Sequence, residues 1–158
     1  MKLWILRHGQ AEAMAASDQR RALTAEGVNE VHSMAALLQS QPLDCILASP
    51  YLRAQQTARL ISDSLGHARG VATAAWLTPD DDPLQVLDFI AERSESHLLL
   101  VSHQPLVGQL ISLLVEGHRR GHYPMPTAGL ACVELDFPAA GLGRLSLLSC
   151  PADLRHQG

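Results

Sequence analysis

The stretch that decides the fold is Leu3-Trp4-Ile5-Leu6-Arg7-His8-Gly9, in which four apolar residues end abruptly in a cation, an imidazole and a glycine. A short apolar run of this kind predicts a strand that is buried in a sheet. In open α/β sheets, binding crevices form just outside the carboxyl ends of the strands. The position of Arg7 and His8 therefore predicts a functional site at the end of the first strand.

Two further segments repeat this arrangement. The apolar run at 45–48 leads within five residues to Arg53, and the run at 98–101 leads to His103. We expect these three strands to end around one crevice, so that two arginines and two histidines converge there. Such a group suits an anion, and above all a phosphoryl group, because guanidinium groups form charge-assisted and often bidentate hydrogen bonds with phosphate oxygens.

Helical and strand patterns alternate along the chain and define the expected fold class. The order predicts an α/β fold with three layers, α/β/α, in which helices cover a mostly parallel sheet with an antiparallel edge. The expected helices are 26–39, 50–65, one that begins at Pro83 and includes Ala91, and 105–115. The further strands are 71–75, 130–137 and 142–148.

Capping residues mark the ends of the expected helices. Thr24 is the expected N-cap of the first helix, and Ser49 with Pro50 is expected to begin the second. Gly66 and Gly117 are expected to end the second and fourth helices, since glycine readily adopts the left-handed conformation. Asp82 is the expected cap of the third helix, whose inward residues are expected to be Leu84, Leu87, Ile90 and Ala91.

The composition excludes several classes of function. With 158 residues, 47% hydrophobic content and a net charge of −4, the chain fits one domain with a substantial core and does not suit nucleic-acid binding. No apolar run has the length of a membrane span or of a secretory leader, so we expect a cytoplasmic protein. Lys2 is the only lysine, which excludes a P-loop lysine and a Schiff base. The three cysteines are few and widely spaced, as in reduced core thiols.

Four segments together carry a family resemblance. They are Leu6-Arg7-His8-Gly9, Arg21-Ala22-Leu23-Thr24, Ser49-Pro50-Tyr51-Leu52-Arg53-Ala54-Gln55-Gln56-Thr57 and Val101-Ser102-His103-Gln104-Pro105-Leu106-Val107-Gly108. In order and spacing they resemble the histidine phosphatase superfamily in its phosphoglycerate-mutase-like branch, and within it the small bacterial phosphohistidine phosphatases of the SixA type. The resemblance covers nearly the whole chain and implies a phosphoglycerate-mutase-like fold, with residues 1–158 as a single histidine-phosphatase domain.

The resemblance also implies roles for four residues. His8 would be the nucleophile that becomes phosphorylated, with one ring nitrogen free and the other holding its proton toward a nearby carbonyl such as that of Gly9. Arg7 and Arg53 would clamp the phosphoryl oxygens. His103 would be the second histidine of the pocket, and donation to the phosphoryl group would favour its protonated form.

Further residues are expected at the edge of this pocket. Arg21 would contact the phosphate or the substrate, although Arg20 beside it also indicates a generally basic loop. Gly9 would allow the main chain to approach the phosphate closely. Gln10 and Ser17 either add neutral donors or are ordinary loop residues. Ser49 and Ser102 are expected to cap helices rather than to attack phosphate.

No metal or other cofactor is expected. His118 and His122 have helical metal-pair spacing, but they lie among glycines and prolines without a nearby cysteine. We interpret this segment as a flexible loop over the pocket mouth that contacts the partner. Two arginines and two histidines can neutralise a phosphoryl group without a metal ion.

The departure from the family pattern concerns the proton donor. Larger phosphatases of the superfamily carry an acid before a stretch comparable to Leu77-Thr78-Pro79, where this chain has Trp76. Asp80 or Asp18 could replace that acid. Alkoxide leaving groups need a proton more than a protonated phosphoimidazole does, so the missing acid favours phosphohistidine over phosphate esters as substrate.

Three functions follow from this reading, and they belong to different classes. The first is a protein-phosphohistidine phosphatase that acts, as a monomer, on phosphotransfer proteins such as histidine-containing phosphotransfer domains or sugar-phosphotransferase carriers. The second is a small-molecule phosphomonoesterase. The third, a non-catalytic phosphoprotein-binding module, is disfavoured by the presence of His8. Neither nucleic acid nor membrane is an expected partner.

Overall fold

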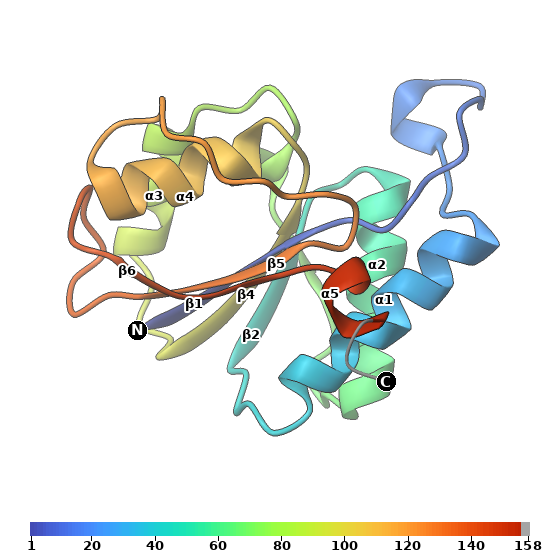
Figure 1. Ribbon diagram of the computed structural model, residues 1–158, viewed down its shortest axis with the longest axis horizontal. Helices are drawn as coiled ribbons and strands as arrows, with labels where there is room; N and C mark the ends of the chain where they lie inside the picture. The colour runs from blue at the N-terminus through green and yellow to red at the C-terminus, as the bar shows by residue number, and fades with distance from the viewer. Residues whose placement is uncertain (156–158) are drawn as a thin grey trace.

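A six-stranded mixed sheet forms the centre of the computed structural model, which describes residues 1–155 (Figure 1). The strand order is β3-β2-β4-β1-β5-β6. The first four strands in this order are parallel, and β5 and β6 add an antiparallel edge. The predicted fold class is therefore confirmed. The strands are β1 (Lys2–Arg7), β2 (Cys45–Ala48), β3 (Ala72–Thr73), β4 (His97–Ser102), β5 (Leu130–Glu134) and β6 (Arg144–Ser149).

Helices cover both faces of this sheet, with α1, α2 and α5 on one side and α3 and α4 on the other (Figure 1). The chain moves outward from β1 through β2 to β3 and then returns to place β4 between β2 and β1. Because parallel crossovers are right-handed, this reversal moves α3 to the opposite face from α1 and α2. The helices are α1 (Ala25–Leu38), α2 (Leu52–Leu65), α3 (Pro83–Ala91), α4 (Leu106–Glu116) and α5 (Pro151–Arg155), with short 3₁₀ turns at Asp18–Arg20 and Ala75–Leu77.

The central strand β1 is buried on both faces, which explains its unbroken apolar run. Leu3 and Ile5 pack in the core beneath α3 and α4, whereas Trp4 and Leu6 pack in the core beneath α1 and α2. None of these four residues is more than 5% exposed. Because successive side chains of a strand point to opposite faces of the sheet, the four residues alternate between two cores.

Most of the predicted helix ends are confirmed. The Thr24 hydroxyl accepts a hydrogen bond from the Gly27 amide at 3.0 Å, and Asp82 caps α3 through the Leu84 amide at 2.9 Å. Gly66 and Gly117 end α2 and α4 with φ of 62° and 85°, in the left-handed region. Local chemistry alone determines these positions, and so the sequence predicts them well.

Two predictions about the helices were wrong. The helix α2 begins at Leu52 rather than at Pro50, because Tyr51 has an extended backbone (φ −64°, ψ 141°) and takes the N-cap position. In α3, Leu84 is 50% exposed and Ala91 is also exposed, while Pro83 and Val86 take the buried positions beside Leu87 and Ile90. The sequence pattern also did not predict α5.

The strand order brings the expected site residues together. β4 lies between β2 and β1, with Ala48 opposite Val101 and Arg7 opposite Ser102. The carboxyl ends of three adjacent parallel strands therefore meet at one edge, at the point where the strand order reverses. The expectation that the first, second and fourth strand candidates end beside one another is confirmed.

Candidate active site

His8 is held by its main chain directly after β1. Its amide donates to the Ser102 carbonyl at 3.1 Å, and its carbonyl accepts from the Ala128 amide at 2.9 Å. The first bond continues the ladder between β1 and β4, and the second attaches His8 to the loop that precedes β5. With 5% of its surface exposed, the residue is fixed from both sides before its side chain makes any contact.

Two hydrogen bonds determine the tautomer of His8. Its Nδ1 lies 2.7 Å from the Gly9 carbonyl oxygen, which can only accept, so Nδ1 carries the proton. Arg53 Nε donates toward His8 Nε2 at 3.3 Å, as is possible only if Nε2 presents a lone pair. Both contacts indicate the same neutral form, with the lone pair on Nε2. The expectation that the Gly9 carbonyl fixes this tautomer agrees with the geometry.

Burial and positive neighbours keep His8 neutral. Burial, together with the charges of Arg53, Arg7 and Arg21, lowers the pKa of His8 to about 4, against the opposing effect of the Gly9 hydrogen bond. At neutral pH the imidazole is therefore unprotonated, and its Nε2 lone pair is available to an electrophile.

His103 lies beside His8, with the two ring centroids 5.0 Å apart. Its Nε2 is 2.7 Å from the Ser49 hydroxyl, and within the described chain its buried Nδ1 has no hydrogen-bond partner. Burial, with the nearby His8 and the arginines, lowers the pKa of His103 to about 2. The protein by itself therefore holds His103 neutral, and the protonated form expected from the sequence requires the negative charge of a phosphoryl group.

Arg53 is buried at the start of α2, and its Nε donates toward Nε2 of His8. Its guanidinium lies 5.1 Å from the centre of the Tyr51 ring, and that ring also packs edge-on against His103. The far end of the guanidinium donates to the Asp18 carbonyl at 2.7 Å and to its carboxylate at 3.3 Å. Only 3% of Arg53 is exposed.

Arg7 lies at the end of β1 and shares the electrostatic environment of the site. Its Nη1 donates to the Met125 carbonyl at 3.0 Å, while its Nε is buried and has no partner among the described residues. Burial lowers the pKa of Arg7, as does the positive charge of Arg53, while Glu30 opposes both effects. The group remains a cation, with a buried donor nitrogen available for an anion.

In the structure, the hydrogen bonds of Arg21 go to residues of its own loop. Its Nε donates to the Asp18 carboxylate at 2.9 Å and its Nη1 to the Glu12 carbonyl at 3.2 Å. Arg21 is nevertheless near enough for its charge to lower the pKa of both His8 and His103. The observed contacts thus connect Arg21 to the site through Asp18.

Gln10 and Gly9 make contacts with α1 and α2 beside the site. The exposed Gln10 side chain accepts from the Thr24 hydroxyl at 2.8 Å, and so it is bound at the start of α1. The amide of Gly9 donates to the Thr57 hydroxyl at 3.1 Å. A Cβ at Gly9 would lie 2.7 Å from the Gly27 carbonyl oxygen, so the structure requires glycine there for close packing against α1.

Several residues that complete the site were not assigned to it from the sequence. Ser49, Tyr51 and Thr57 lie in the same segment as Arg53, and this shared segment was the available signal. The Glu30 carboxylate accepts from the Gln10 amide at 2.8 Å and from the Thr127 hydroxyl at 3.0 Å, and so it joins two loops beside the site. Nothing in the local sequence of Glu30 indicates this contact.

Ser102 and Trp76 have structural contacts. The Ser102 hydroxyl donates to the Leu77 carbonyl at 2.7 Å, so the prediction that Ser102 caps a helix was wrong. Trp76 stacks on Phe89 with ring centroids 4.9 Å apart and packs against the core beneath α3 and α4. This packing accounts for an aromatic residue at the position where the larger phosphatases of the superfamily carry an acid.

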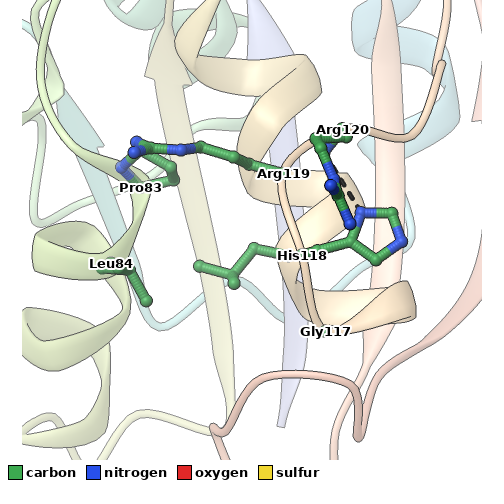
Figure 2. Close-up of a pocket in the computed structure, with 7 residues that line it drawn as sticks. Pro83, Leu84, Gly117, His118, Arg119 and Arg120 are labelled. Carbon is green, nitrogen blue, oxygen red and sulfur yellow. Dashed lines mark hydrogen bonds between the residues drawn. The ribbon is translucent and has the colours of Figure 1, made fainter.

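His118 lies in a separate hollow of about 320 Å³ between the start of α3 and the end of α4 (Figure 2). Pro83, Leu84 and Arg119 line this hollow, which shares no lining residue with the group around His8. The His118 ring accepts from the Arg120 amide at 3.2 Å. Within residues 1–155, no cluster of three or more His, Cys, Asp or Glu residues could hold a metal ion, and no helix is long and apolar enough to cross a membrane.

Comparisons with known proteins agree with this geometry. The sequence profile of the histidine phosphatase superfamily (branch 1) matches residues 3–76. The phosphohistidine phosphatase SixA of Escherichia coli is 34% identical, with 98% of this chain and 97% of that protein covered. The adenosylcobalamin/alpha-ribazole phosphatase of Salmonella typhimurium is 37% identical over 73% of this chain and 80% of its own length.

A solved structure has the same fold as this chain. The protein histidine phosphatase SixA complexed with tungstate superposes with a TM-score of 0.87 at 33% identity, covering 98% of this chain and 99% of that one. Relatives above 30% identity that match almost the entire chain establish its family. The chain belongs to the histidine phosphatase superfamily, branch 1.

Proposed function

We propose that the protein is a protein-phosphohistidine phosphatase, a hydrolase that acts on phosphotransfer proteins through a phospho-His8 intermediate. The observation that carries this proposal is the neutral His8, whose Nε2 lone pair faces Arg53 at 3.3 Å beside a second buried histidine. The near full-length similarity to SixA supports the choice of phosphohistidine. Tungstate, which is bound in the SixA structure, is an oxyanion of the same tetrahedral shape as phosphate.

The reaction has two displacement steps. His8 Nε2 forms a bond to phosphorus while the bond from phosphorus to the substrate imidazole nitrogen breaks, and the leaving imidazole departs neutral because it was already protonated. Arg7 and Arg53 bind the phosphoryl oxygens, and His103 donates from its buried ring nitrogen. Water then attacks phospho-His8, which releases inorganic phosphate and restores the free imidazole.

The contacts of the candidate acids favour phosphohistidine over esters as substrate, because most of these acids are already engaged in hydrogen bonds. Asp18 is held by two arginines, Asp81 accepts from the Thr78 amide and hydroxyl at 2.8 and 2.6 Å, and Asp82 caps α3. Asp80 is exposed and lines a hollow that Pro105 also lines, two residues after His103. Asp80 is thus the remaining candidate for protonating an alkoxide leaving group.

A second candidate function is a small-molecule phosphomonoesterase. It is favoured by the 37% identity to an adenosylcobalamin/alpha-ribazole phosphatase. Under either function, we propose that residues 1–158 act as one domain, as a monomer in the cytoplasm, without a metal ion or other cofactor.

Relative specificity decides between the two functions. We would measure kcat/KM for a phosphohistidine-containing phosphotransfer domain, a phosphohistidine sugar-phosphotransferase carrier, an aryl phosphate and a panel of sugar phosphates. The proposal requires a phosphohistidine protein to be the best substrate. Faster hydrolysis of any sugar phosphate than of either protein would support the phosphomonoesterase.

A further inference from the structure

We infer that Asp18 is a positioning residue of this site, which holds the Arg53 guanidinium in the orientation that presents Nε to His8. This inference rests on the proposed role of Arg53 in phosphoryl transfer. Asp18 lies in the 3₁₀ turn Asp18–Arg20, in the long connection between β1 and α1 that stands away from the sheet (Figure 1).

Asp18 binds Arg53 through two different acceptors. Its main-chain carbonyl accepts from Arg53 Nη1 at 2.7 Å, and its carboxylate Oδ2 accepts from Nη2 at 3.3 Å. These contacts fix the distal end of the guanidinium. The remaining nitrogen of the plane, Nε, is the one that lies 3.3 Å from His8 Nε2. A planar group held at its distal end and by its stem cannot rotate without breaking a contact.

The donor count leaves Arg53 able to bind an anion as well. A guanidinium has five N–H donors, and the three contacts to Asp18 and His8 use three of them. The other two are available to phosphoryl oxygens. Asp18 therefore holds the Arg53 guanidinium in place without using all of its donors. This reduces the rotamer entropy that the Arg53 side chain would otherwise lose on binding an anion.

Asp18 is itself anchored on its other side. Its second carboxylate oxygen, Oδ1, accepts from Arg21 Nε at 2.9 Å, and Arg21 also donates to the Glu12 carbonyl. Although burial opposes it, the pKa of Asp18 is lowered by the hydrogen bonds and charges of Arg21 and Arg53. Asp18 is thus ionised at neutral pH and serves as an acceptor of hydrogen bonds. This argues against Asp18 as the proton donor that the sequence left open.

The test compares Asp18→Ala and Asp18→Asn with Asp88→Asn, which removes an exposed carboxylate of α3. The first readout is the Kd for tungstate, which involves no turnover and does not depend on the true substrate. Losing hydrogen bonds to a charged group predicts binding at least about 10-fold weaker for Asp18→Ala, with an intermediate loss for Asp18→Asn. Asp88→Asn should bind as wild type. Unchanged or tighter binding by Asp18→Ala would overturn the inference.

A second readout separates positioning from a general structural effect. The Arg53 Nε–H signal in nitrogen NMR spectra should broaden or vanish in Asp18→Ala while the backbone amide spectrum is retained. Combining Asp18→Ala with Arg53→Lys should weaken tungstate binding no further than Arg53→Lys alone, since Asp18 acts through Arg53. Additive losses would contradict the inference. A preference for esters in the specificity assay would reject the proposed substrate but leave both of these results standing.

Discussion

The neutral state of His8 comes from its surroundings and can be tested by titration. Burial and three nearby arginines lower its pKa to about 4, and the pKa of His103 falls to about 2. In an unfolded chain both rings would have a pKa of about 6.5. A nuclear magnetic resonance titration should therefore find His8 still neutral at pH 5. A pKa of 6.5 or higher for His8 in the folded protein would contradict this account of the site.

The same shifts predict how stability depends on pH. Below about pH 6.5 the two histidines bind protons in the unfolded chain but not in the folded protein. The free energy of unfolding therefore falls as the pH falls. Each ring contributes up to about 1.4 kcal/mol per pH unit in the window between its unfolded and folded pKa. The variant His103→Gln removes one ring and should show a shallower decline between pH 6 and 5 in urea titrations. An equally steep decline in the variant would show that other groups are responsible.

Arg53 acts through its shape as well as its charge. Arg53→Lys keeps a cation but loses the planar fork that faces His8 and Asp18 at the same time. Losing one transition-state contact commonly costs on the order of 10²–10³ in rate, so we expect kcat to fall by about that factor. Thermal unfolding of the variant serves as the control for its fold. Near-normal kinetics would show that a point charge is sufficient at this position.

At the scale of elements, the site depends on close contact between the end of β1 and the helix α1. A methyl group at Gly9 would lie 2.7 Å from the Gly27 carbonyl oxygen and 3.0 Å from a methyl of Val31. Gly9→Ala should therefore destabilise the protein by about 1–3 kcal/mol, as measured by urea unfolding. The matched control is Gly108→Ala in α4, where the nearest atom belongs to the flexible Gln104 side chain at 2.9 Å. The control should lose little stability, or gain up to about 1 kcal/mol from helix propensity. Equal losses in the two variants would contradict the packing argument.

The sequence predicts elements where one local interaction determines them. The Thr24 and Asp82 caps and the stops at Gly66 and Gly117 are of this kind, and all are present in the structure. The predicted start of α2 was wrong because Tyr51 is extended and takes the N-cap position, two residues after the expected cap at Ser49. The exposure of Leu84 does follow from a local pattern, because Pro83, Val86, Leu87 and Ile90 have the spacing i, i+3, i+4 and i+7 of one helix face, and Leu84 lies off that face.

At the scale of the whole molecule, topology explains why the central group of the site could be found from the sequence. His8, Arg53 and His103 all follow strands whose carboxyl ends must meet at one edge of a parallel sheet. Asp18, by contrast, reaches Arg53 from a loop, and Glu30 reaches Thr127 across 97 residues. Such contacts depend on how loops pack in three dimensions. The sequence therefore predicts that the strand-end residues meet, and it points to Arg21 and Asp18 in the loop, but it does not predict the contacts through which the loop residues support the site.

The distribution of charge predicts independence from metal ions. The chain carries a net charge of −4, yet Arg7, Arg53 and Arg21 give the region around His8 a local excess of positive charge. This region can neutralise a phosphoryl group without a divalent cation. Millimolar chelator should leave kcat/KM for a phosphohistidine protein unchanged, while added salt should raise KM by screening the arginines. Loss of activity in chelator that added Mg²⁺ or Zn²⁺ restores would contradict the prediction.

The central claim is that His8 carries the phosphoryl group during turnover, and rapid-quench trapping with a radiolabelled phosphohistidine carrier tests it most directly. Wild-type protein quenched in base should carry acid-labile label that peptide mapping places on His8. The variant His8→Ala should keep its circular dichroism spectrum, acquire no label and release no phosphate. A labelled or fully active His8→Ala variant, or a label mapped to another residue of the wild type, would contradict the account.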